Sequence, residues 1–518
     1  MPKEAFPNVS PEVRAILQRF TSEAFYINED HAMRDRAIYS TTLYIATCDV
    51  KMKMGNFTAH IFQDIIHKGY VIALAYGDIR SENEIFTRIH SSCVTGETLR
   101  ACDCDCAQQL EGALQRIAAS GAGILFYLMQ EGRGVGYIAK SRDRMLVQAS
   151  NDEISTFEAY RLLGLKRDYR QYRNVKPICQ LLGIDPKFIL LTNNPDKVNI
   201  LKDLEVNIIR SERLEITPTP YNLAYLTSKM EAGHMLTSPQ EQEVTRIKLP
   251  AQVIPFKPHA VQNAQRFIYV SSYFLPVLPV EDEIILSETE FKQCFGTHSP
   301  DVLMHNQPPL ILSHQKLQDR RFSIKIHRDN LTHWKKEHQG DPLGDLTHLP
   351  YWFRVHVYFD IVSCEDYVVL TYGNAEPYDI PIVRIQSESI FNRFPLVDTD
   401  NRDKFKATVK AIVQHGVGAI VLLYNDGRGA GFGAYAEDLM LIEKGLSHNT
   451  DESYQKLGVG YDNRDYEAAI TLLKEHIPSN HVQMVMNSPD SLVKKPEYAE
   501  ALNSHKIQVD KWIFLENF

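Results

Sequence analysis

The stretch SGAGILFYLMQEGRGVGYIAKSRDRML at 120–146 occurs twice in this chain, the second time as HGVGAIVLLYNDGRGAGFGAYAEDLML at 415–441. In each copy, a short apolar run bounded by turn residues predicts a buried strand, and it leads into a charged loop rich in glycine. Glycine lets the backbone approach a ligand closely, and loops of this kind lie against phosphate groups or bases. The stretch therefore predicts a repeated fold and a nucleotide-type site.

Three further pairs of segments repeat in the same order along the chain. Their first members are residues 69–93, 155–172 and 192–198, which return at 366–389, 449–466 and 486–492. The offset between partners stays between 294 and 297 residues across all four blocks. Because chance matches would not keep both order and offset, we interpret the chain as a duplication of about 200 residues.

The length of 518 residues also requires more than one hydrophobic core. We predict a mixed α/β (α+β) fold in which one domain occurs twice in tandem. The predicted parts are an N-terminal extension at 1–40, a first repeat at 41–236, a polar linker at 237–260, and a second repeat at 261–518 with a loop-rich insertion near 261–350.

Local patterns predict the main elements of the first repeat. The predicted strands lie at 69–78, 122–128 and 188–194, and the predicted helices at 106–121 and 174–184. Within 106–121, apolar residues recur every three to four positions from Leu110 to Ile117, and the segment ends on a glycine, as helices commonly do.

Composition excludes several classes of protein. A net charge of −9 and a pI near 6.1 argue against a surface built to bind nucleic acid. No apolar run reaches the length of a membrane span, and the N-terminal sequence lacks the pattern of a secretory signal. Eight cysteines in a chain of this length indicate metal binding rather than a disulfide framework. We expect a cytoplasmic protein with neither nucleic acid nor membrane as a partner.

The thiols form the second strong signal, in RIHSSCVTGETLRACDCDCAQQLEGAL at 88–114. Cys93 lies eleven positions before Cys104, and Cys106 follows two residues later. Three thiolates around zinc leave the fourth position open for water, which is typical of a catalytic site. Cys102 in the same run leaves two alternatives open: a closed structural site with four thiolates, or thiols that only fill a core. Spacing does not decide which thiols bind.

These thiols are followed in order by QEGRG (130–134), LLG-x3-D-x-R (162–170) and LLTNNPDKV (190–198), and with them the first repeat resembles GTP cyclohydrolase II. The resemblance runs from about residue 50 to about residue 236, and the second repeat resembles the same family more faintly. It implies a hydrolase that opens the imidazole ring of GTP, releasing formate and pyrophosphate, as the first committed step of riboflavin synthesis. The product is a diaminopyrimidine ribosyl phosphate.

The resemblance also implies cofactors and catalytic residues. It assigns one zinc ion to Cys93, Cys104 and Cys106, to activate a water for attack on C8 of guanine, and Mg²⁺ to the triphosphate. It makes Asp168 the general base and Arg170 a nucleophile toward the α-phosphorus. The residue types alone are equally compatible with an ion pair whose arginine is an electrostatic clamp for phosphate, so both roles stay open for Arg170.

The family's substrate contacts match a further set of positions: Arg88, Ser92, Gln109, Glu131, Gly132, Arg133, Thr156, Thr192 and Lys197. Glu131 can accept hydrogen bonds from the donor edge of guanine, and Arg133 and Lys197 suit phosphate oxygens. Without the resemblance, Thr192 would be interpreted as the start of a turn and Lys197 as a solvated surface lysine.

The second repeat lacks zinc ligands. Ser389 occupies the place of Cys93, and neither thiol nor histidine remains around Asp400 and Arg402. Met486 and Ser491 replace Thr192 and Lys197. Residues that keep their chemical character are Asp426, Gly427, Arg428, Thr450, Asp462 and Arg464. We expect a scaffold that replaces the second subunit of a homodimer, giving a pseudo-dimer within one chain, with further homo-oligomerisation left open.

Three departures from the family pattern keep other functions open. Ser92 stands where an acidic residue is usual, Ala107 where glycine is usual, and Arg144 where tyrosine is common. The alternatives are a ring-opening cyclohydrolase for another nucleotide, in uracil catabolism or specialised metabolism, and a nucleotide-binding regulator without catalysis. The acidic signature of dihydroxybutanone phosphate synthase, often fused to this family, is absent.

Overall fold

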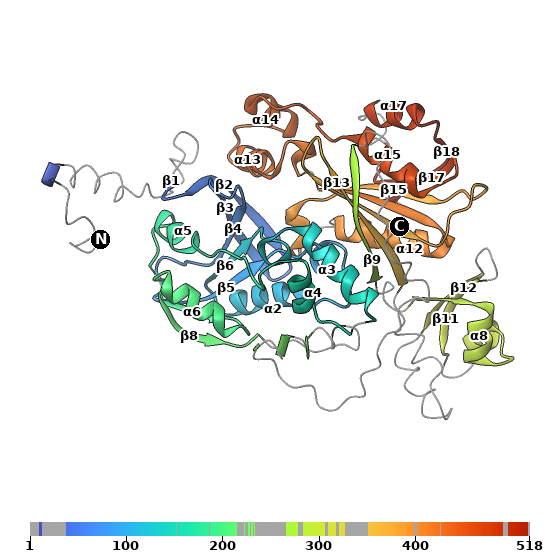
Figure 1. Ribbon diagram of the computed structural model, residues 1–518, viewed down its shortest axis with the longest axis horizontal. Helices are drawn as coiled ribbons and strands as arrows, with labels where there is room; N and C mark the ends of the chain where they lie inside the picture. Colours follow the sequence, from blue (N-terminus) through green and yellow to red (C-terminus); the bar gives the residue numbers. More distant parts are fainter. Residues whose placement is uncertain are drawn as a thin grey trace.

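The computed structural model consists of two large mixed sheets, one per repeat, and a small third sheet (Figure 1). It describes residues 10–12, 38–151, 153–185, 187–214, 222, 226–227, 229–230, 233, 266–277, 283–305, 309–316, 321–326, 351–397, 401–424, 426–489 and 496–515. The predicted tandem α+β fold is confirmed. The predicted linker at 237–260 lies outside the described residues, as does most of the extension at 1–40.

The first repeat forms an eight-stranded sheet. In sheet order its strands are β1 (Ile38–Tyr39), β2 (Thr42–Met52), β3 (Gly55–Asp64), β4 (Tyr70–Tyr76), β6 (Gly123–Leu128), β5 (Glu84–Ser91), β7 (Lys187–Leu191) and β8 (Ile208–Glu212). Its helical segments are η1 (Val94–Thr98), α2 (Cys106–Ala119), η2 (Gly132–Gly134), α3 (Tyr137–Ala149), α4 (Thr156–Leu162), α5 (Val175–Leu181) and α6 (Pro195–Asp203). Strands β6, β5, β7 and β8 run parallel, so their carboxyl ends meet at one edge.

The second repeat forms a seven-stranded sheet of the same design. In sheet order its strands are β9 (Phe267–Val277), β13 (Tyr351–Asp360), β14 (Asp366–Tyr372), β16 (Gly418–Leu423), β15 (Ile382–Ser387), β17 (His481–Met486) and β18 (Gln508–Phe514). Its helical segments are η4 (Ile390–Arg393), α12 (Asn401–His415), η5 (Gly427–Gly429), α13 (Phe432–Glu443), α14 (Thr450–Leu457), α15 (Tyr466–His476) and α17 (Pro496–Ser504).

The span from 261 to 350 differs from the expected loop-rich insertion. Its first described part is β9, which pairs with β13 and so belongs to the second large sheet. A bulge skips Val270 in β9 as another skips Ile45 in β2, which makes these two strands equivalent. The extra sequence therefore follows β9. It contains a peripheral sheet of β10 (Glu283–Ser287), β12 (Arg321–Ile326) and β11 (Ile311–Lys316), with α8 (Glu288–Phe295) and α9 (Pro300–His305) (Figure 1).

The local elements predicted for the first repeat are confirmed. The predicted strands correspond to β4, β6 and β7, and the predicted helices to α2 and α5. Leu110, Ala113, Leu114 and Ile117 of α2 are all fully buried, because their helical spacing turns one face of the helix toward the sheet. Among the described residues, no helix is long and apolar enough to cross a membrane.

The two repeats pack against each other through equivalent elements. Helix α3 of the first repeat packs on β9 of the second, and α13 of the second packs on β2 of the first. Residue Met52 pairs with Leu396 across the interface, and Ala101 pairs with Val277 in the equivalent, reversed contact. This reciprocal pattern relates the two repeats by a pseudo-two-fold arrangement.

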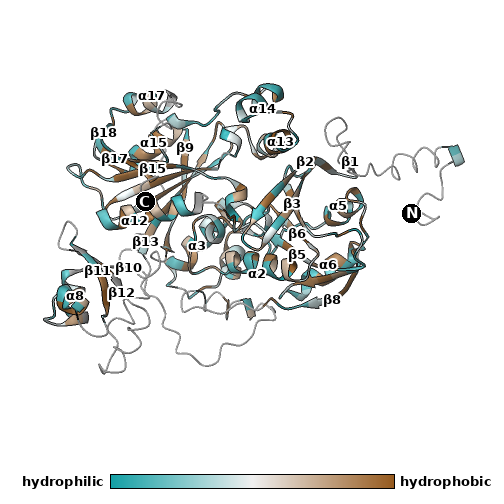
Figure 2. Ribbon diagram, turned by 180° about the vertical axis from the view of Figure 1, so that it is seen from behind, coloured by the Kyte–Doolittle hydropathy of each residue, from teal (hydrophilic) through white to brown (hydrophobic). Residues whose placement is uncertain are grey.

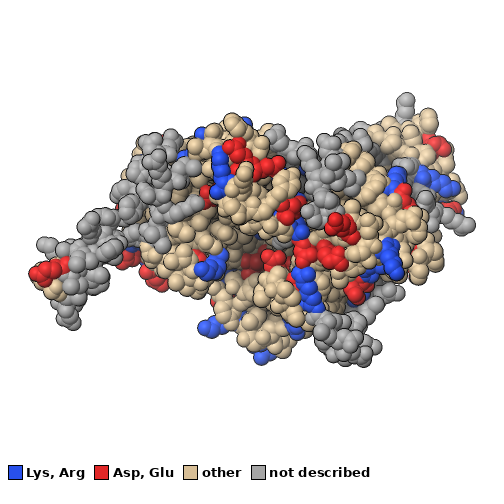
Figure 3. Space-filling model, turned by 90° about the horizontal axis from the view of Figure 1, so that it is seen from above, with Lys and Arg blue, Asp and Glu red and all other residues tan. Residues whose placement is uncertain are grey.

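Two of the hydrophobic cores among the described residues contain residues of both repeats. The core of the first sheet includes Phe391, Phe394 and Phe432 of the second repeat, and a core of the second sheet includes Leu99 and Tyr137 of the first. Figure 2 shows hydrophobic residues concentrated in the strands of both sheets. On the face shown in Figure 3, basic and acidic side chains of the described residues are intermingled. Apolar burial therefore joins the repeats into one packed unit.

A buried polar network also crosses this interface. His90 Nε2 lies 2.8 Å from Glu97 Oε1, and the Tyr127 hydroxyl donates to Glu97 Oε2 at 2.6 Å. From the second repeat, Arg393 donates to the Tyr127 oxygen at 3.2 Å and to Glu388 at 2.8 Å. Glu97 and Arg393 are equivalent positions of the two repeats, so these positions carry opposite charges.

We predict that Arg393→Ala lowers the free energy of unfolding by about 3–5 kcal/mol, because it leaves Glu388 and Glu97 buried without their cation. Urea denaturation of the full chain measures this change. Arg210→Ala is the control: Arg210 is half exposed beside Glu84 and Glu212, so its loss should cost less than about 1 kcal/mol. Equal, small effects of both substitutions would contradict the importance of the network.

Candidate active site

The thiols of Cys93, Cys104 and Cys106 all lie within 4.8 Å of one another. Cys93 Sγ is 3.6 Å from Cys104 Sγ, and two thiolates bound to one tetrahedral zinc would lie about 3.8 Å apart. Cys93 follows the end of β5, and Cys106 begins α2, where the helix N-terminus favours the thiolate form. The donor set and its spacing therefore fit a zinc ion.

Gly96 and Cys102 show how the chain selects three of its four local thiols. A Cβ atom on Gly96 would lie 3.0 Å from Cys104 Sγ, so a larger residue there would press on the cluster. The Cys102 thiol points elsewhere and donates to the carbonyl of Pro276 at 3.4 Å. Burial raises the pKa of Cys102 and keeps it protonated. The geometry thus separates Cys102 from the other three.

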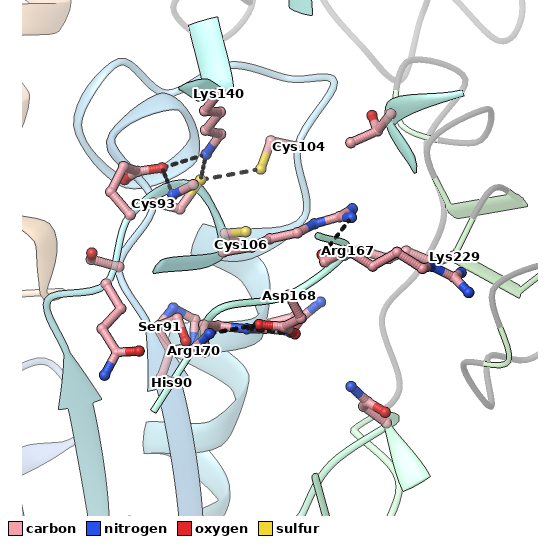
Figure 4. A pocket seen from close by; sticks show the side chains of 18 of the residues that line it. His90, Ser91, Cys93, Cys104, Cys106, Lys140, Arg167, Asp168, Arg170 and Lys229 are labelled. Atoms are coloured by element: carbon pink, nitrogen blue, oxygen red, sulfur yellow. Dashed lines mark hydrogen bonds and ion pairs between the residues drawn. The ribbon is translucent and has the colours of Figure 1, made fainter. Parts of the chain in front are cut away.

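Lys140 and Glu131 lie directly against the thiol cluster. Lys140 Nζ, from α3, is 3.0 Å from Cys93 Sγ and 2.7 Å from Glu131 Oε1 (Figure 4). Hydrogen bonds from the Cys104 and Cys106 thiols, together with the Lys140 ammonium, lower the pKa of Cys93 well below its usual value. A positive charge at this place favours the thiolate needed for metal binding.

The position of Glu131 limits its predicted role toward guanine. Glu131 Oε2 accepts from the backbone N–H of Val94 at 2.6 Å, and Oε1 accepts from Lys140 and from Gly132 N. Both oxygens are therefore engaged within the chain, which leaves little acceptor capacity for a base. Burial raises the pKa of Glu131. In this structure Glu131 supports the segment after Cys93.

A cavity of about 330 Å³ lies beside the thiols, at the carboxyl edge of the parallel strands β6, β5 and β7. This edge is where open α/β sheets commonly bind ligands. All fourteen residues predicted from the sequence line the cavity: Cys93, Cys104, Cys106, Asp168, Arg170, Arg88, Ser92, Gln109, Glu131, Gly132, Arg133, Thr156, Thr192 and Lys197. Their roles in binding and catalysis stay predictions.

Asp168 and Arg170 form an ion pair within the cavity (Figure 4). Arg170 Nε donates to Asp168 Oδ1 at 2.9 Å and to Oδ2 at 3.0 Å. Burial opposes ionisation, but the Arg170 guanidinium outweighs it and lowers the pKa of Asp168. Asp168 is therefore an ionised acceptor, and Arg170 stays charged beside it.

Lys197 is buried, so its interpretation as a solvated surface lysine is wrong. Only 6% of Lys197 is exposed, and its ammonium donates to the carbonyl of Ile89 at 3.0 Å. Burial, with the neighbouring Arg170 and Arg88 cations, lowers its pKa well below the usual value. Thr192 has the predicted turn role, since its hydroxyl accepts from Asn194 N at 3.1 Å.

The glycine-rich loop brings η2 against the segment that carries Arg170. Arg133 has a φ of 56°, and a Cβ atom on Gly134 would lie 2.9 Å from the backbone of Tyr169. Gly134, with a φ of 90°, permits this close approach. The Arg133 guanidinium lies 4.1 Å from the centre of the Phe157 ring, which restricts its direction.

The cavity carries an excess of positive charge. Sequence reasoning did not identify four of its cationic residues as site residues: Lys140, Arg144, Arg167 and Lys229. With Arg88, Arg133, Arg170 and Lys197 they make eight cations, against five acidic residues. An excess of this kind suits a polyanionic ligand. Comparison of the two repeats did not point to Lys140, because the equivalent residue of the second repeat is Tyr435.

The corresponding region of the second repeat has a different chemistry. Ser389 and Tyr435 stand where the first repeat has Cys93 and Lys140. The retained pair Asp462 and Arg464 forms an ion pair, and Asp426 accepts from Ile390 N at 2.9 Å, as Glu131 does from Val94 N. Asp400 and Ser491 lie outside the described residues, as does the side chain of Arg402.

Comparisons with known proteins agree with this division. A family model described as GTP cyclohydrolase II matches residues 44–213 and again residues 347–505. The chain is 40% identical over 201 residues to GTP cyclohydrolase-2 of Hahella chejuensis, covering 39% of this chain and 95% of that protein. It is 40% identical over 195 residues to GTP cyclohydrolase-2 of Neisseria meningitidis, covering 38% and 96%.

We predict that Cys104→Ser removes most zinc binding, because it breaks the three-thiolate set. Zinc per chain, measured by atomic absorption after dialysis, should fall from about one to near zero. Cys102→Ser is the matched control in the same loop and should keep its zinc. Full zinc content in the Cys104 variant would contradict the assignment.

We predict that Asp426 makes stability depend on pH. Burial raises the pKa of Asp426 to about 7, well above the ordinary value of an aspartate. The bound proton therefore stabilises the fold fully below about pH 4, and this contribution is lost as the pH rises to about 7. Asp426→Asn keeps an acceptor for Ile390 N without ionising. Between about pH 5 and pH 8, urea denaturation should show the natural chain losing stability relative to this variant; parallel profiles would contradict it.

Proposed function

Because the chain belongs to the GTP cyclohydrolase II family, which consists of hydrolases, we propose that its first repeat opens the imidazole ring of GTP and releases formate and pyrophosphate. The observation that carries this proposal is the meeting of three thiols and a group of cationic side chains, Arg88, Arg170 and Lys197 among them, in one cavity. A metal-activated water needs the thiols, and a triphosphate needs the cations. The product would be a diaminopyrimidine ribosyl phosphate.

The thiols of Cys93, Cys104 and Cys106 would hold the zinc ion, which when bound supplies the Lewis acidity that activates water for ring opening. Lys140 would favour the thiolate of Cys93 electrostatically. Ionised Asp168 would accept the proton that leaves during attack.

The cations on the far side of the cavity would bind the triphosphate. Lys197 of α6 and Arg88 of β5 are buried, so their charge is little screened by solvent. Arg170 is fixed by Asp168 and stays charged, so we assign it the role of an electrostatic clamp on the phosphates rather than of a nucleophile. Mg²⁺ would be held by phosphate oxygens and water.

The second repeat would be a scaffold that does not turn over substrate. It lacks the thiols and the lysine of the first site, and its surface completes the first repeat's core. It would therefore take the place of the second subunit in a pseudo-dimer.

The deciding assay measures formate and pyrophosphate from the zinc-loaded chain given GTP and Mg²⁺, with other nucleoside triphosphates and UMP in parallel. We expect both products from GTP. If formate and pyrophosphate are released from another nucleotide and not from GTP, GTP is not the substrate. The departures from the family pattern, such as Ser92, would then be the first explanation to test for the changed specificity.

We predict that Arg170→Ala lowers kcat for pyrophosphate release by about 100-fold or more, because a charge positioned on the reacting phosphates is lost. Arg464→Ala is the matched control, since Arg464 is the equivalent residue of the second repeat and pairs with Asp462 in the same way. Its kinetics should stay within about threefold of the natural chain. A large loss in the Arg464 variant would show that the second repeat is more than a scaffold.

A further inference from the structure

The loop that carries two of the three clustered thiols runs along a strand of the other repeat. We call residues 101–106 the thiol loop. Its first residue, Ala101, pairs with Val277 at the end of β9, and Cys102 N donates to the Pro276 carbonyl at 3.1 Å. The Cys102 thiol donates to the same carbonyl. The backbone of the thiol loop is therefore bound to the second repeat.

Side chains connect β9 to the same loop. Arg144, on α3, forms a partly buried ion pair with Asp103, which directly precedes Cys104. The Arg144 guanidinium also lies 5.0 Å from the centre of the Tyr273 ring of β9. The Tyr273 hydroxyl in turn is hydrogen-bonded to the Tyr137 hydroxyl at 2.5 Å. Arg144 is thus fixed between an aromatic ring of one repeat and the metal-binding loop of the other.

Helix α3 is itself held on β9 by polar contacts along its length. Ser271 Oγ donates to Ser141 Oγ at 2.5 Å. The Gln148 side chain makes two hydrogen bonds to the backbone of Phe274, at 2.7 and 2.8 Å. Because Lys140 on this helix contacts Cys93, β9 orients a helix that reaches the cluster at both Cys93 and the thiol loop.

Among the described residues, the reversed contact keeps only part of this arrangement: Glu443 of α13 accepts from Asp49 N of β2, as Gln148 does from Phe274 N, but the contact of Arg144 with Tyr273 has no counterpart. The offset of 295 residues places Leu439 of α13 where α3 has Arg144. Equivalent strand positions place Cys48 of β2 where β9 has Tyr273. Both Cys48 and Leu439 belong to an apolar cluster. The aromatic–guanidinium contact is thus present on the side where the thiols lie, and at these two positions apolar packing takes its place on the other side.

We propose that β9 of the second repeat, acting through Tyr273 and Arg144, positions the thiol loop for metal binding, although the second repeat contributes no ligand. Arg144 is then a positioning residue rather than a substrate contact, and its departure from the family's tyrosine serves the interface between repeats. The inference rests on the zinc site of the proposed function. Residues that orient metal ligands change metal affinity by about 10–100-fold when removed.

The test uses the full-length chain and two readouts, zinc affinity by competition with a chelator and the thiolate absorption of the Co²⁺-substituted protein. Tyr273→Leu and Arg144→Met should each weaken zinc binding by about 10–100-fold and alter the Co²⁺ spectrum. Tyr273→Phe keeps the ring beneath the guanidinium and should bind zinc within about threefold of the natural chain.

Leu439→Ala is the matched control, because it weakens the equivalent helix-to-strand contact on the side without thiols. It should lose stability but keep zinc affinity and the Co²⁺ spectrum. If Tyr273→Leu fails to fold, as judged by circular dichroism, Arg144→Met decides the question.

Unchanged zinc affinity and an unchanged Co²⁺ spectrum in Arg144→Met would overturn the inference and leave the proposed function intact. An equal loss of zinc affinity in Leu439→Ala would also overturn it, because general loosening of the interface would then explain the effect. Failure of the natural chain to bind zinc would overturn the proposed zinc site together with the inference.

Discussion

Mutual burial of the two repeats is the constraint on which the rest of this structure depends. Each large sheet has a core to which the other repeat contributes: aromatic side chains such as Phe394 and Phe432 enter the first core, and Leu99 and Tyr137 enter a core of the second sheet. Apolar burial is non-directional and proportional to area, so it tolerates divergence in sequence provided that the covered surfaces remain apolar. The second repeat therefore can lose its site chemistry, but it cannot lose the faces of α13 and η4 without exposing the first repeat's core.

This constraint explains which residues the second repeat has kept. Asp426 accepts a hydrogen bond from Ile390 N, just as Glu131 accepts one from Val94 N, so both acidic residues hold the short helix that follows a strand end. The Asp462–Arg464 pair repeats the Asp168–Arg170 pair and fixes the same turn. Residues of this kind stabilise the fold by pairing with buried polar groups. Under the proposed function, Cys93 and Lys140 would instead serve the metal site, and Ser389 and Tyr435 stand at their places in the second repeat.

Duplication within one chain also permits an asymmetry that two identical subunits cannot have. Glu97 and Arg393 are equivalent positions, and in this chain they carry opposite charges joined through Tyr127. In a symmetric dimer the same positions would carry like charges, which repel at short range in a poorly solvated interface. The charge pair thus favours pairing of the first repeat with the second. The chain of Tyr273, Arg144 and Asp103 is a second asymmetry at the same interface.

The amino-acid sequence by itself determined the duplication, the main elements of the first repeat, and fourteen of the residues that line the cavity. These features are encoded locally. The apolar spacing of α2 and the glycine-rich turn before α3 depend on residues close together in the sequence, and the order of the motifs identified the cavity residues. Tertiary structure alone decided the burial of Lys197, the engagement of Glu131 by Lys140, the separation of Cys102 from the other thiols, and the membership of β9 in the second sheet. Each of these depends on what a segment meets after folding. Strand β9 pairs with β13, which follows the inserted sheet in the sequence, and Arg144 contacts Tyr273 of the other repeat. Local sequence patterns therefore could not predict either contact.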